Sequence, residues 1–561
     1  MVEVTKEVIK AYALENAIKH KGKANQGAVL AGLFAEGLEK SQIKDYMPKI
    51  QEAINEVNSL TLENQQEEFK KSSQKTSKRE IREGLPELPN AEDGKVVMRL
   101  APYPSGPLHI GNARPAILND EYSKRYKGKL ILFIDDTIGS EGKPIEPEAY
   151  KLIEEGLRWL GVDFKEILYK SDRNEKYYAY AEELLKKGYM YVCDCPQDEW
   201  KKTKDKGTEC SCRQYPGEIQ LKRWQKMFTA KEGSMCVRLK TSMTAPDPAF
   251  RDRVMFKISD RPHPRTKTKY RIYPAMEFSW AIDDSLIKTT HILRGIEHQM
   301  STKIQDFIRE IFQWKNPEST YNGLFEIEGV KISKSKGAKE VKSGTYAGWN
   351  DPRTWSLQSL RDRGIQPEAL RKFIIDLGIK KTNIKVPVDV LYTHNRRLLE
   401  ESPRYFFVED PEKIHINGCP PLTANLPLHP NGTKGFRTYD TNQDFLIARQ
   451  DLELMREGNY RLMHLLNFKV DNIARLKPKE YSFISEEPNN DLKTKFIHWL
   501  PHTPYNIPIE LIMPDGSKKK GLGESELEKL KVGSIVQFER FGFVRLHKKE
   551  KDKLEFWFAH N

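Results

Sequence analysis

The first seventy residues carry apolar side chains at helical spacing. Apolar positions recur three and four residues apart in two stretches, namely Ile9, Tyr12, Ala13, Ala17 and Ile18, and then Ile43, Ile50, Ile54 and Val57. This spacing gathers apolar side chains on one face of a helix. We therefore predict a small helical region over residues 1–70.

A charged and serine-rich run follows over residues 71–93. It holds several lysines and serines, with Gly84, Pro86 and Pro89 near its end. So few apolar side chains cannot offset the entropy of ordering the chain. The run is predicted to be a linker.

The next segment alternates between strand and helix patterns. Residues 96–100 and 130–133 form apolar, strand-like runs, and between them lie a loop rich in Pro and Gly and a helical stretch from Asn112 to Tyr126. In α/β nucleotide-binding folds, glycines just ahead of a helix form the turn that faces phosphate. The spacing from Ala149 to Leu160 predicts a further amphipathic helix, which Gly161 ends.

The last part of the chain changes to short β-rich runs that Pro, Gly and Asn interrupt. Such runs occupy residues 508–514, 536–544 and 556–558. The pattern predicts antiparallel barrels over residues 421–561. The expected fold class is therefore multidomain α/β plus all-β, with a small helical N-terminal region.

Length and charge narrow the picture. A chain of 561 residues is too long for one hydrophobic core, since single cores stop growing near roughly 250–300 residues. Lys and Arg exceed Asp and Glu by 93 to 80, and this net charge of +13 favours a polyanionic partner. The first twenty residues are charged and we find no apolar run of about 18 residues, so we expect no membrane association and a cytoplasmic location.

Residues 99–112 form the strongest local motif, Arg-Leu-Ala-Pro-Tyr-Pro-Ser-Gly-Pro-Leu-His-Ile-Gly-Asn. Prolines stiffen this loop, while Gly106 and Gly111 let a ligand approach the backbone. A helix that starts at Asn112 is expected to offer unpaired N–H groups to phosphate. The loop is suited to a nucleotide.

A second motif stands far downstream at residues 329–337, Gly-Val-Lys-Ile-Ser-Lys-Ser-Lys-Gly. Alone, a lysine–serine run of this kind is typical of a solvated basic loop. Together and in this order, the two motifs resemble the HIGH and KMSKS signatures of class I aminoacyl-tRNA synthetases.

Further segments narrow the resemblance to the glutamyl branch, in its archaeal form. They are residues 21–33, 135–137, 148–161, 171–173, 282–284 with 290, 291 and 294, 348–353, 395–397 and 537–542. The resemblance implies a Rossmann-type catalytic domain over residues 94–330 with an inserted acceptor-binding and zinc segment around 190–250. It also implies a KISKS loop and helical connecting region over 331–420 and anticodon-binding barrels over 421–561.

The implied reaction is ATP-dependent activation of glutamate to glutamyl-adenylate, followed by transfer to the 3′ end of tRNA-Glu. Negative charge builds on the phosphates, so catalysis needs cations and donors, which His109, Lys334 and Mg²⁺ on the leaving pyrophosphate are expected to supply. The residues implied to bind ATP are His109, Ile110, Gly111, Asn112, Lys331, Ser333, Lys334 and Ser335.

Four residues are implied to bind glutamate. Arg99 would pair with the side-chain carboxylate through its planar two-pronged guanidinium, and Asp135 would hold the α-ammonium. Arg294 would serve the α-carboxylate region, and Ala101 would line the pocket. The alternatives are that Asp135 caps the turn after its strand and that Arg294 is an ordinary surface charge.

Three positions depart from the family pattern. Asn112 stands where the last His of HIGH would be, Phe133 where an arginine often precedes the acidic pair, and Met276 where a tyrosine usually contacts the substrate. An amide at position 112 keeps its hydrogen-bonding capacity, whereas Met276 removes a hydroxyl. The amino-acid pocket therefore follows from the resemblance less directly than the nucleotide site does.

Four of the six cysteines form a C-x-C, fourteen-residue, C-x-C array made of Cys193, Cys195, Cys210 and Cys212. Four soft thiolates suit tetrahedral Zn²⁺, and they leave no open position for catalysis. The array predicts a structural zinc site. The alternative is four cysteines without a metal, since one intervening residue is tighter than the usual spacing.

Several alternatives stay open. A glutaminyl-tRNA synthetase shares both motifs, although the amino-terminal resemblance favours glutamate. A tRNA-binding paralogue that has lost catalysis is disfavoured by the intact His109, Gly111, Lys334 and Ser335, and a small nucleotidyltransferase is disfavoured by length. Kinship with archaeal enzymes also implies charging of tRNA-Gln with glutamate, for hand-off to an amidotransferase.

Overall fold

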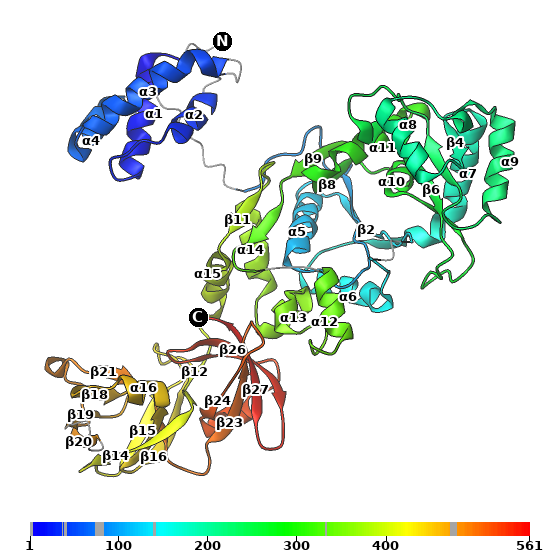
Figure 1. Cartoon of the computed structure of the whole chain (residues 1–561). Coiled ribbons are helices and arrows are strands. Elements are labelled where there is room, and N and C mark those ends of the chain that lie inside the picture. Colours follow the sequence, from blue (N-terminus) through cyan, green and yellow to red (C-terminus); the bar gives the residue numbers. More distant parts are fainter. Residues whose placement is uncertain are drawn as a thin grey trace. The chain divides into compact units, whose positions relative to one another are not determined.

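The computed structural model describes residues 4–35, 38, 42–72, 84–138, 142–330, 334–471 and 479–561. The chain divides into two compact units, Met1–Glu83 and Gly84–Asn561, which are described separately. Figure 1 labels their helices and strands. In the described ranges no helix is both long enough and apolar enough to cross a membrane.

The first unit is helical. Its helices are α1 (Lys6–Lys19), α2 (Gln26–Ala35), α3 (Ile43–Ser59) and α4 (Leu62–Ser72). Ile9, Leu14 and Ile50 belong to its buried core. The buried amide of Gln65 donates to three backbone carbonyls, those of Gly22, Val57 and Leu60, and so ties the loops of the unit together.

The second unit begins with a parallel sheet in the strand order β1-β2-β3. Its elements are β1 (Val97–Leu100), α5 (Ile110–Arg125), β2 (Lys129–Ile134), α6 (Pro147–Trp159) and β3 (Glu166–Tyr169). Residues 130–134 of β2 are all buried, as expected for a parallel strand covered on both faces. The predicted β-loop-α-β unit is confirmed.

The carboxyl ends of these strands share one edge of the sheet, where α/β folds bind ligands. Arg99 lies near the end of β1, Asp135 follows β2, and Lys170 follows β3 as the first residue of the short helix η3 (Lys170–Arg173). Asp136 fastens two of these ends together, because it accepts hydrogen bonds from the backbone and the hydroxyl of Ser171, at 2.8 and 2.7 Å.

An antiparallel sheet, β4-β5-β6-β7, is inserted after η3. The elements of this part are α7 (Asn174–Lys186), β4 (Met190–Cys193), α8 (Gln197–Lys206), η4 (Ser211–Gln214), α9 (Gly217–Met227), β5 (Cys236–Leu239), β6 (Val254–Ile258) and β7 (Ile272–Pro274). The chain then returns to the parallel sheet, because Thr290 just before β8 bonds to Val97 of β1.

The returning segment contains α10 (Met276–Leu286), β8 (His291–Gly295), α11 (Gln299–Ile311) and β9 (Glu318–Asn322). After it come β10 (Phe325–Ile327), α12 (Lys334–Lys342), α13 (Leu357–Arg363), α14 (Pro367–Leu377), β11 (Ile384–Val386) and α15 (Val388–Leu399).

The rest of the second unit is β-rich. Two seven-stranded sheets have the orders β12-β25-β26-β27-β23-β24-β13 and β21-β18-β19-β20-β14-β17-β22, and β15 pairs with β16. Burial alternates along β14 and β15, as in half-buried strands. The predicted fold class, multidomain α/β plus all-β, is confirmed.

The β-rich part begins at Arg404, before the predicted boundary at residue 421, because β12 and β13 pair with strands more than a hundred residues further along the chain. Its first strands are β12 (Arg404–Tyr405), β13 (Phe407–Glu409), β14 (Pro411–Asn417), β15 (Leu422–Pro427), β16 (Phe436–Thr441), β17 (Asp444–Ala448) and β18 (Gly458–Leu462), with helix α16 (Arg449–Leu454) between the last two. The later strands are β19 (Asn467–Asp471), β20 (Glu480–Ser485), β21 (Lys495–Ile497), β22 (Leu500–Pro501), β23 (Ile507–Ile512), β24 (Lys518–Gly523), β25 (Ile535–Phe538), β26 (Gly542–Lys549) and β27 (Leu554–His560).

Candidate active site and cysteine cluster

The first motif forms the start of α5. His109 is the N-cap residue, and its Nδ1 accepts a hydrogen bond from the backbone N–H of Gly111 at 3.1 Å. The side-chain oxygen of Asn112 accepts in return from the backbone N–H of His109 at 3.3 Å. This reciprocal capping shows how an amide replaces the last histidine of the family motif.

The start of α5 differs from the prediction. The helix begins two residues earlier, and its first N–H groups are paired: Ile110 donates to the carbonyl of Trp355 at 3.2 Å, and Asn112 donates to the carbonyl of His109 at 2.8 Å. The expectation that this helix offers unpaired N–H groups to phosphate is therefore wrong, because local sequence does not reveal the capping contacts. Phosphate binding here would depend on side chains instead.

The second motif lies partly outside the description. Lys331 and Ser333 fall outside the described residues, and Lys334 and Ser335 are the first residues of α12, with side chains that are not described. A contact between the two motifs is nevertheless visible at Trp349. A Cβ atom at Gly106 would lie 2.9 Å from the Trp349 ring, and one at Gly337 would lie 3.3 Å from it. Glycine at both positions lets the two motif segments pack on the same indole.

Arg99 is buried at the end of β1 and forms an ion pair with a partner on α10. Its Nε and Nη2 donate to the two carboxylate oxygens of Asp284, at 2.5 and 3.0 Å. One edge of the two-pronged guanidinium is thus used within the protein. Within the described residues Nη1 has no hydrogen bond, so the outer edge remains for a ligand carboxylate.

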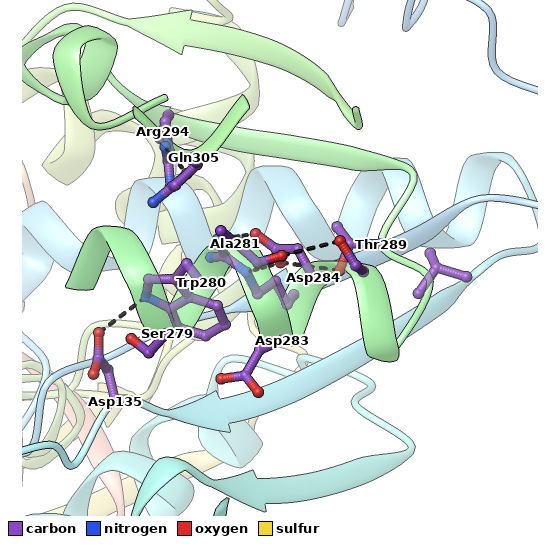
Figure 2. A network of polar contacts seen from close by, with 12 residues as sticks. Asp135, Ser279, Trp280, Ala281, Asp283, Asp284, Thr289, Arg294 and Gln305 are labelled. Atoms are coloured by element: carbon purple, nitrogen blue, oxygen red, sulfur yellow. Dashed lines mark hydrogen bonds and ion pairs between the residues drawn. The ribbon is translucent and has the colours of Figure 1, made fainter. Parts of the chain in front are cut away.

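Asp284 accepts further hydrogen bonds, one of which Figure 2 shows. The Thr289 hydroxyl donates to it at 3.1 Å, and Arg309 Nη2 lies 3.3 Å away. Although complete burial would raise its pKa, Arg99 and Arg309 hold the pKa of Asp284 below its ordinary value. Arg309 also pairs with Asp306 at 2.9 Å.

Arg294, at the end of β8, is the third guanidinium of this cluster. Its Nη1 donates to Thr302 and Gln305, both at 2.9 Å, and its buried Nε has no hydrogen-bond partner among the residues that the structure describes. Burial, and secondly the charge of Arg99, lower the pKa of Arg294 to about 10. It is therefore not an ordinary surface charge. Arg99, Arg309 and Arg294 all act electrostatically on Asp284, and Arg309 also pairs with Asp306, so these five side chains carry three positive and two negative charges.

Asp135 lies at the other end of the same polar network. The indole N–H of Trp280 donates to it at 3.0 Å, as Figure 2 shows, and the Thr137 hydroxyl donates at 3.2 Å. The Nζ of Lys170 lies 3.4 Å away. Asp135 therefore does more than cap the turn after β2. Ala101, just beyond β1, is exposed.

The two departures at positions 133 and 276 surround Trp280. Phe133 packs edge-on against the indole, with ring centroids 5.0 Å apart. Met276 is the first residue of α10 and packs into the same apolar cluster. Positions 133 and 276 thus both carry apolar side chains that belong to, or pack against, the cluster around Trp280.

The four cysteines converge as the array predicts. Their sulfur atoms all lie within 4.8 Å of one another, and Cys195 and Cys212 are 3.7 Å apart. Four sulfurs at about 2.3 Å from a tetrahedral zinc ion would be about 3.8 Å apart, so the donor set fits Zn²⁺.

Buried Gln220 holds this cluster in place. Its Oε1 accepts from the Val192 N–H at 2.8 Å, and its Nε2 donates to the Cys212 carbonyl at 2.8 Å. The two cysteine-bearing segments are fixed together by one side chain of α9, so the geometry does not depend on the metal alone.

Three arginines of the β-rich part differ in their exposure. Arg437 is buried in an ion pair with Glu524, and Arg461 is buried against Asn467, so neither is an exposed contact for a partner. Arg540 does reach the surface, where Asp451 orients it through two bonds of 2.8 Å. It lines a cavity of about 700 Å³ together with Gln537, Phe541 and His498.

Sequence reasoning missed three residues of this site. Asp284 lies in a segment that resembles the glutamyl branch, but sequence reasoning assigned it no role. It assigned none to Lys170 or Trp280 either. Trp280 stands four residues before Asp284 on α10, which places both on one helix face, and this spacing is the only local signal that links them.

Known protein families match the α/β part and the β-rich part of this chain separately. Residues 95–401 match the catalytic domain of tRNA synthetases class I (E and Q), and residues 402–483 and 496–547 match the anticodon-binding domain of the same group. A glutamate–tRNA ligase from Pyrococcus abyssi is 43 % identical over 100 % of both chains. One from Methanocaldococcus jannaschii is 41 % identical over 99 % of this chain and 100 % of its own.

A solved glutamate tRNA ligase from Elizabethkingia meningosepticum is 20 % identical, with a TM-score of 0.40 over 55 % of this chain and 70 % of its own. The sequence relatives align over the whole chain, and the match to the catalytic domain covers more than half of its residues. This chain therefore belongs to the family of class I tRNA synthetases for glutamate and glutamine.

Proposed function

We propose that this protein is a glutamate–tRNA ligase, which uses ATP to activate glutamate and transfers it to the 3′ end of tRNA-Glu. The observation that carries the proposal is the surplus positive charge of Arg99, Arg294 and Arg309 over Asp284 and Asp306, because a carboxylate ligand would balance it. The full-length relatives that share the name glutamate–tRNA ligase support it and disfavour glutamine.

Within this function, the pocket residues take separate roles. The outer edge of Arg99 binds the side-chain carboxylate of glutamate, and Asp135 accepts the α-ammonium. Arg294 attracts the α-carboxylate, and Ala101 lines the opening. Arg99 and Arg294 lie on strands β1 and β8, Asp135 directly follows β2, and α10 carries Asp284. Because these elements are rigid, the substrate is oriented before the reaction.

The nucleotide roles rest on the two motifs. His109, Ile110, Gly111 and Asn112 shape the ATP site, and the second motif contributes Lys331, Ser333, Lys334 and Ser335. Since the first N–H groups of α5 are internally paired, the charge that develops on the phosphates falls to His109 and Lys334. Mg²⁺, when bound with ATP, would neutralise charge on the leaving pyrophosphate.

A structural zinc ion at Cys193, Cys195, Cys210 and Cys212 belongs to the same proposal. Purified protein is expected to contain about one equivalent of zinc, and Cys212→Ser is expected to lose most of it because three thiolates hold Zn²⁺ more weakly than four. Elemental analysis checks this. The matched control is Cys419→Ser, at a buried cysteine of the β-rich part. Full zinc in Cys212→Ser, or less than a tenth of an equivalent in the wild type, would contradict the assignment.

We also propose that the enzyme charges tRNA-Gln with glutamate, for later conversion by an amidotransferase. The cavity beside Arg540 and Phe541 combines a cation, an aromatic ring and an amide, which can hold a nucleotide of the anticodon by stacking and phosphate pairing. Such contacts tolerate different bases, and the two anticodon families differ only in their last base.

Charging of tRNA-Glu and tRNA-Gln transcripts with radiolabelled glutamate tests both the proposed ligase activity and the proposed use of tRNA-Gln. At matched salt, we expect kcat/KM for the two tRNAs to agree within about a hundredfold, because stacking and phosphate contacts do not distinguish the last base of the anticodon. A preference for tRNA-Glu above about a thousandfold would mean a discriminating enzyme, and no charging of either tRNA would contradict the proposed function.

A further inference from the structure

Lys170 is a fully buried lysine beside the pocket. Its side chain has no exposed surface, and its Nζ donates to the Ser279 hydroxyl at 2.6 Å. The same ammonium lies 3.8 Å from the ring centre of Trp280 and 3.4 Å from Asp135. A buried lysine is rare without a partner, so this ammonium has a specific counter-ion.

The surrounding charges identify that counter-ion. Asp135 and Asp283 are the acidic groups that face Lys170, and Arg99 is the nearest further cation. Asp283 is already engaged by Arg173 at 2.5 Å and by the Tyr177 hydroxyl at 2.5 Å. Burial lowers the pKa of Lys170, and the two carboxylates oppose that shift. Asp135 is therefore the carboxylate whose charge Lys170 chiefly balances.

Trp280 connects this pair to the arginine end of the pocket. Its indole N–H donates to Asp135 (Figure 2). The guanidinium carbon of Arg99 lies 3.6 Å from the ring centre. The ring thus contacts both cations, Lys170 and Arg99. Cation–π contacts of this kind fix the positions of all three side chains.

We propose that Lys170 is a positioning residue that limits the affinity of this pocket for an ammonium group, because it gives Asp135 a permanent internal counter-ion. This inference rests on the proposed glutamate site. A ligand ammonium at Asp135 must share the carboxylate with Lys170, which cannot withdraw because it is buried and bonded to Ser279. Like charges a few ångströms apart in a protein interior repel strongly enough to change affinity by about tenfold or more.

The proposal predicts an unusual direction of change. Lys170→Met keeps the length and bulk of the side chain but removes its charge. Among the described residues, Asp135 then retains the side-chain hydrogen bonds from Trp280 and Thr137 and loses the ion pair with Lys170, so a ligand ammonium no longer shares the carboxylate with that lysine. Affinity for the ammonium end should therefore rise, whereas ordinary damage to the pocket would lower it.

The test compares two ligands that differ only in the ammonium group. Calorimetry measures the Kd of glutamate and of glutarate, which lacks the amino group, for the wild type, Lys170→Met and Ser279→Ala. We expect the ratio of the glutarate Kd to the glutamate Kd to rise about tenfold or more in Lys170→Met. Ser279→Ala removes the hydroxyl partner but keeps the charge, so its ratio should stay within about threefold of the wild type.

The outcomes distinguish a failure of the role of Lys170 from a failure of the proposed glutamate site. An unchanged or lower ratio in Lys170→Met overturns the role of Lys170, and so does an equal rise in Ser279→Ala, which would show that packing alone matters. If Lys170→Met does not fold, Lys170→Gln carries the same test, since it is neutral but keeps a donor for Ser279. A wild type that binds glutamate no tighter than glutarate overturns the assignment of Asp135 itself, and with it the glutamate site.

Discussion

Replacement of Arg99 by glutamine is expected to lower kcat/KM for glutamate in tRNA charging by about a thousandfold. The substituted amide cannot form a charge-assisted pair with the substrate carboxylate, and loss of one partner of a buried charged pair costs about 4 kcal/mol, which corresponds to nearly three powers of ten. The KM for ATP should stay within about threefold, because the proposed nucleotide contacts lie on residues 109–112 and on the second motif, and not on Arg99.

The measurement is steady-state charging with glutamate and ATP varied separately. Arg158→Gln is the matched control, since that arginine is exposed and contacts Glu154 on its own helix and the ring of Phe164. Wild-type values of kcat and KM for glutamate in the Arg99 variant would contradict its role, as would an equal loss for both substrates.

Replacement of Asp284 by asparagine is expected to destabilise the second unit by about 3–5 kcal/mol, because it removes one partner of a buried ion-pair network. The side chain is completely buried, and among the described residues the change leaves Arg99 without an anionic partner and Arg309 with Asp306 alone. The isosteric amide keeps the shape of the side chain, so the effect isolates the charge.

Thermal unfolding of the full chain measures the effect as a lower midpoint for the transition of the second unit. Asp163→Asn is the control, because Asp163 pairs with Lys165 at an exposed position. A midpoint unchanged from the wild type would show that Asp284 does not hold the cluster together. Partial recovery of the midpoint by saturating glutamate would agree with a ligand that binds the same arginines.

The local elements of the catalytic domain were predictable, because hydrophobic periodicity and glycine placement act over a few residues. The strand that ends near Arg99 and the helix that follows His109 were found within two residues of their bounds. The cysteine cluster was also predictable, since the paired C-x-C spacing brings soft ligands together whatever the fold between them.

The polar network of the pocket was not predictable in the same way. Asp284 lies 185 residues from Arg99 in sequence, and only the return of α10 to the parallel sheet brings the two together. Lys170 resembles any lysine at the end of a strand, and its burial depends on Ser279 and Trp280 from another segment. The burial of Arg437 likewise depends on a distant partner, because Glu524 lies 87 residues further along the chain.

The same reasoning explains the error at the start of α5. Free N–H groups at a helix start are a general expectation, but here the carbonyl of Trp355, far downstream, accepts one of them. Tertiary contacts therefore changed the chemistry of the nucleotide loop, although the sequence had located the loop correctly.

The central claim is that the surplus positive charge of the arginine cluster selects a carboxylate side chain. Charging of tRNA-Glu with glutamate and with glutamine at equal concentrations, with ATP and Mg²⁺, tests it most directly. We expect kcat/KM for glutamate to exceed that for glutamine by about a thousandfold or more, because the neutral amide leaves a buried guanidinium group unbalanced. Equal use of the two amino acids, or a preference for glutamine, would contradict the account.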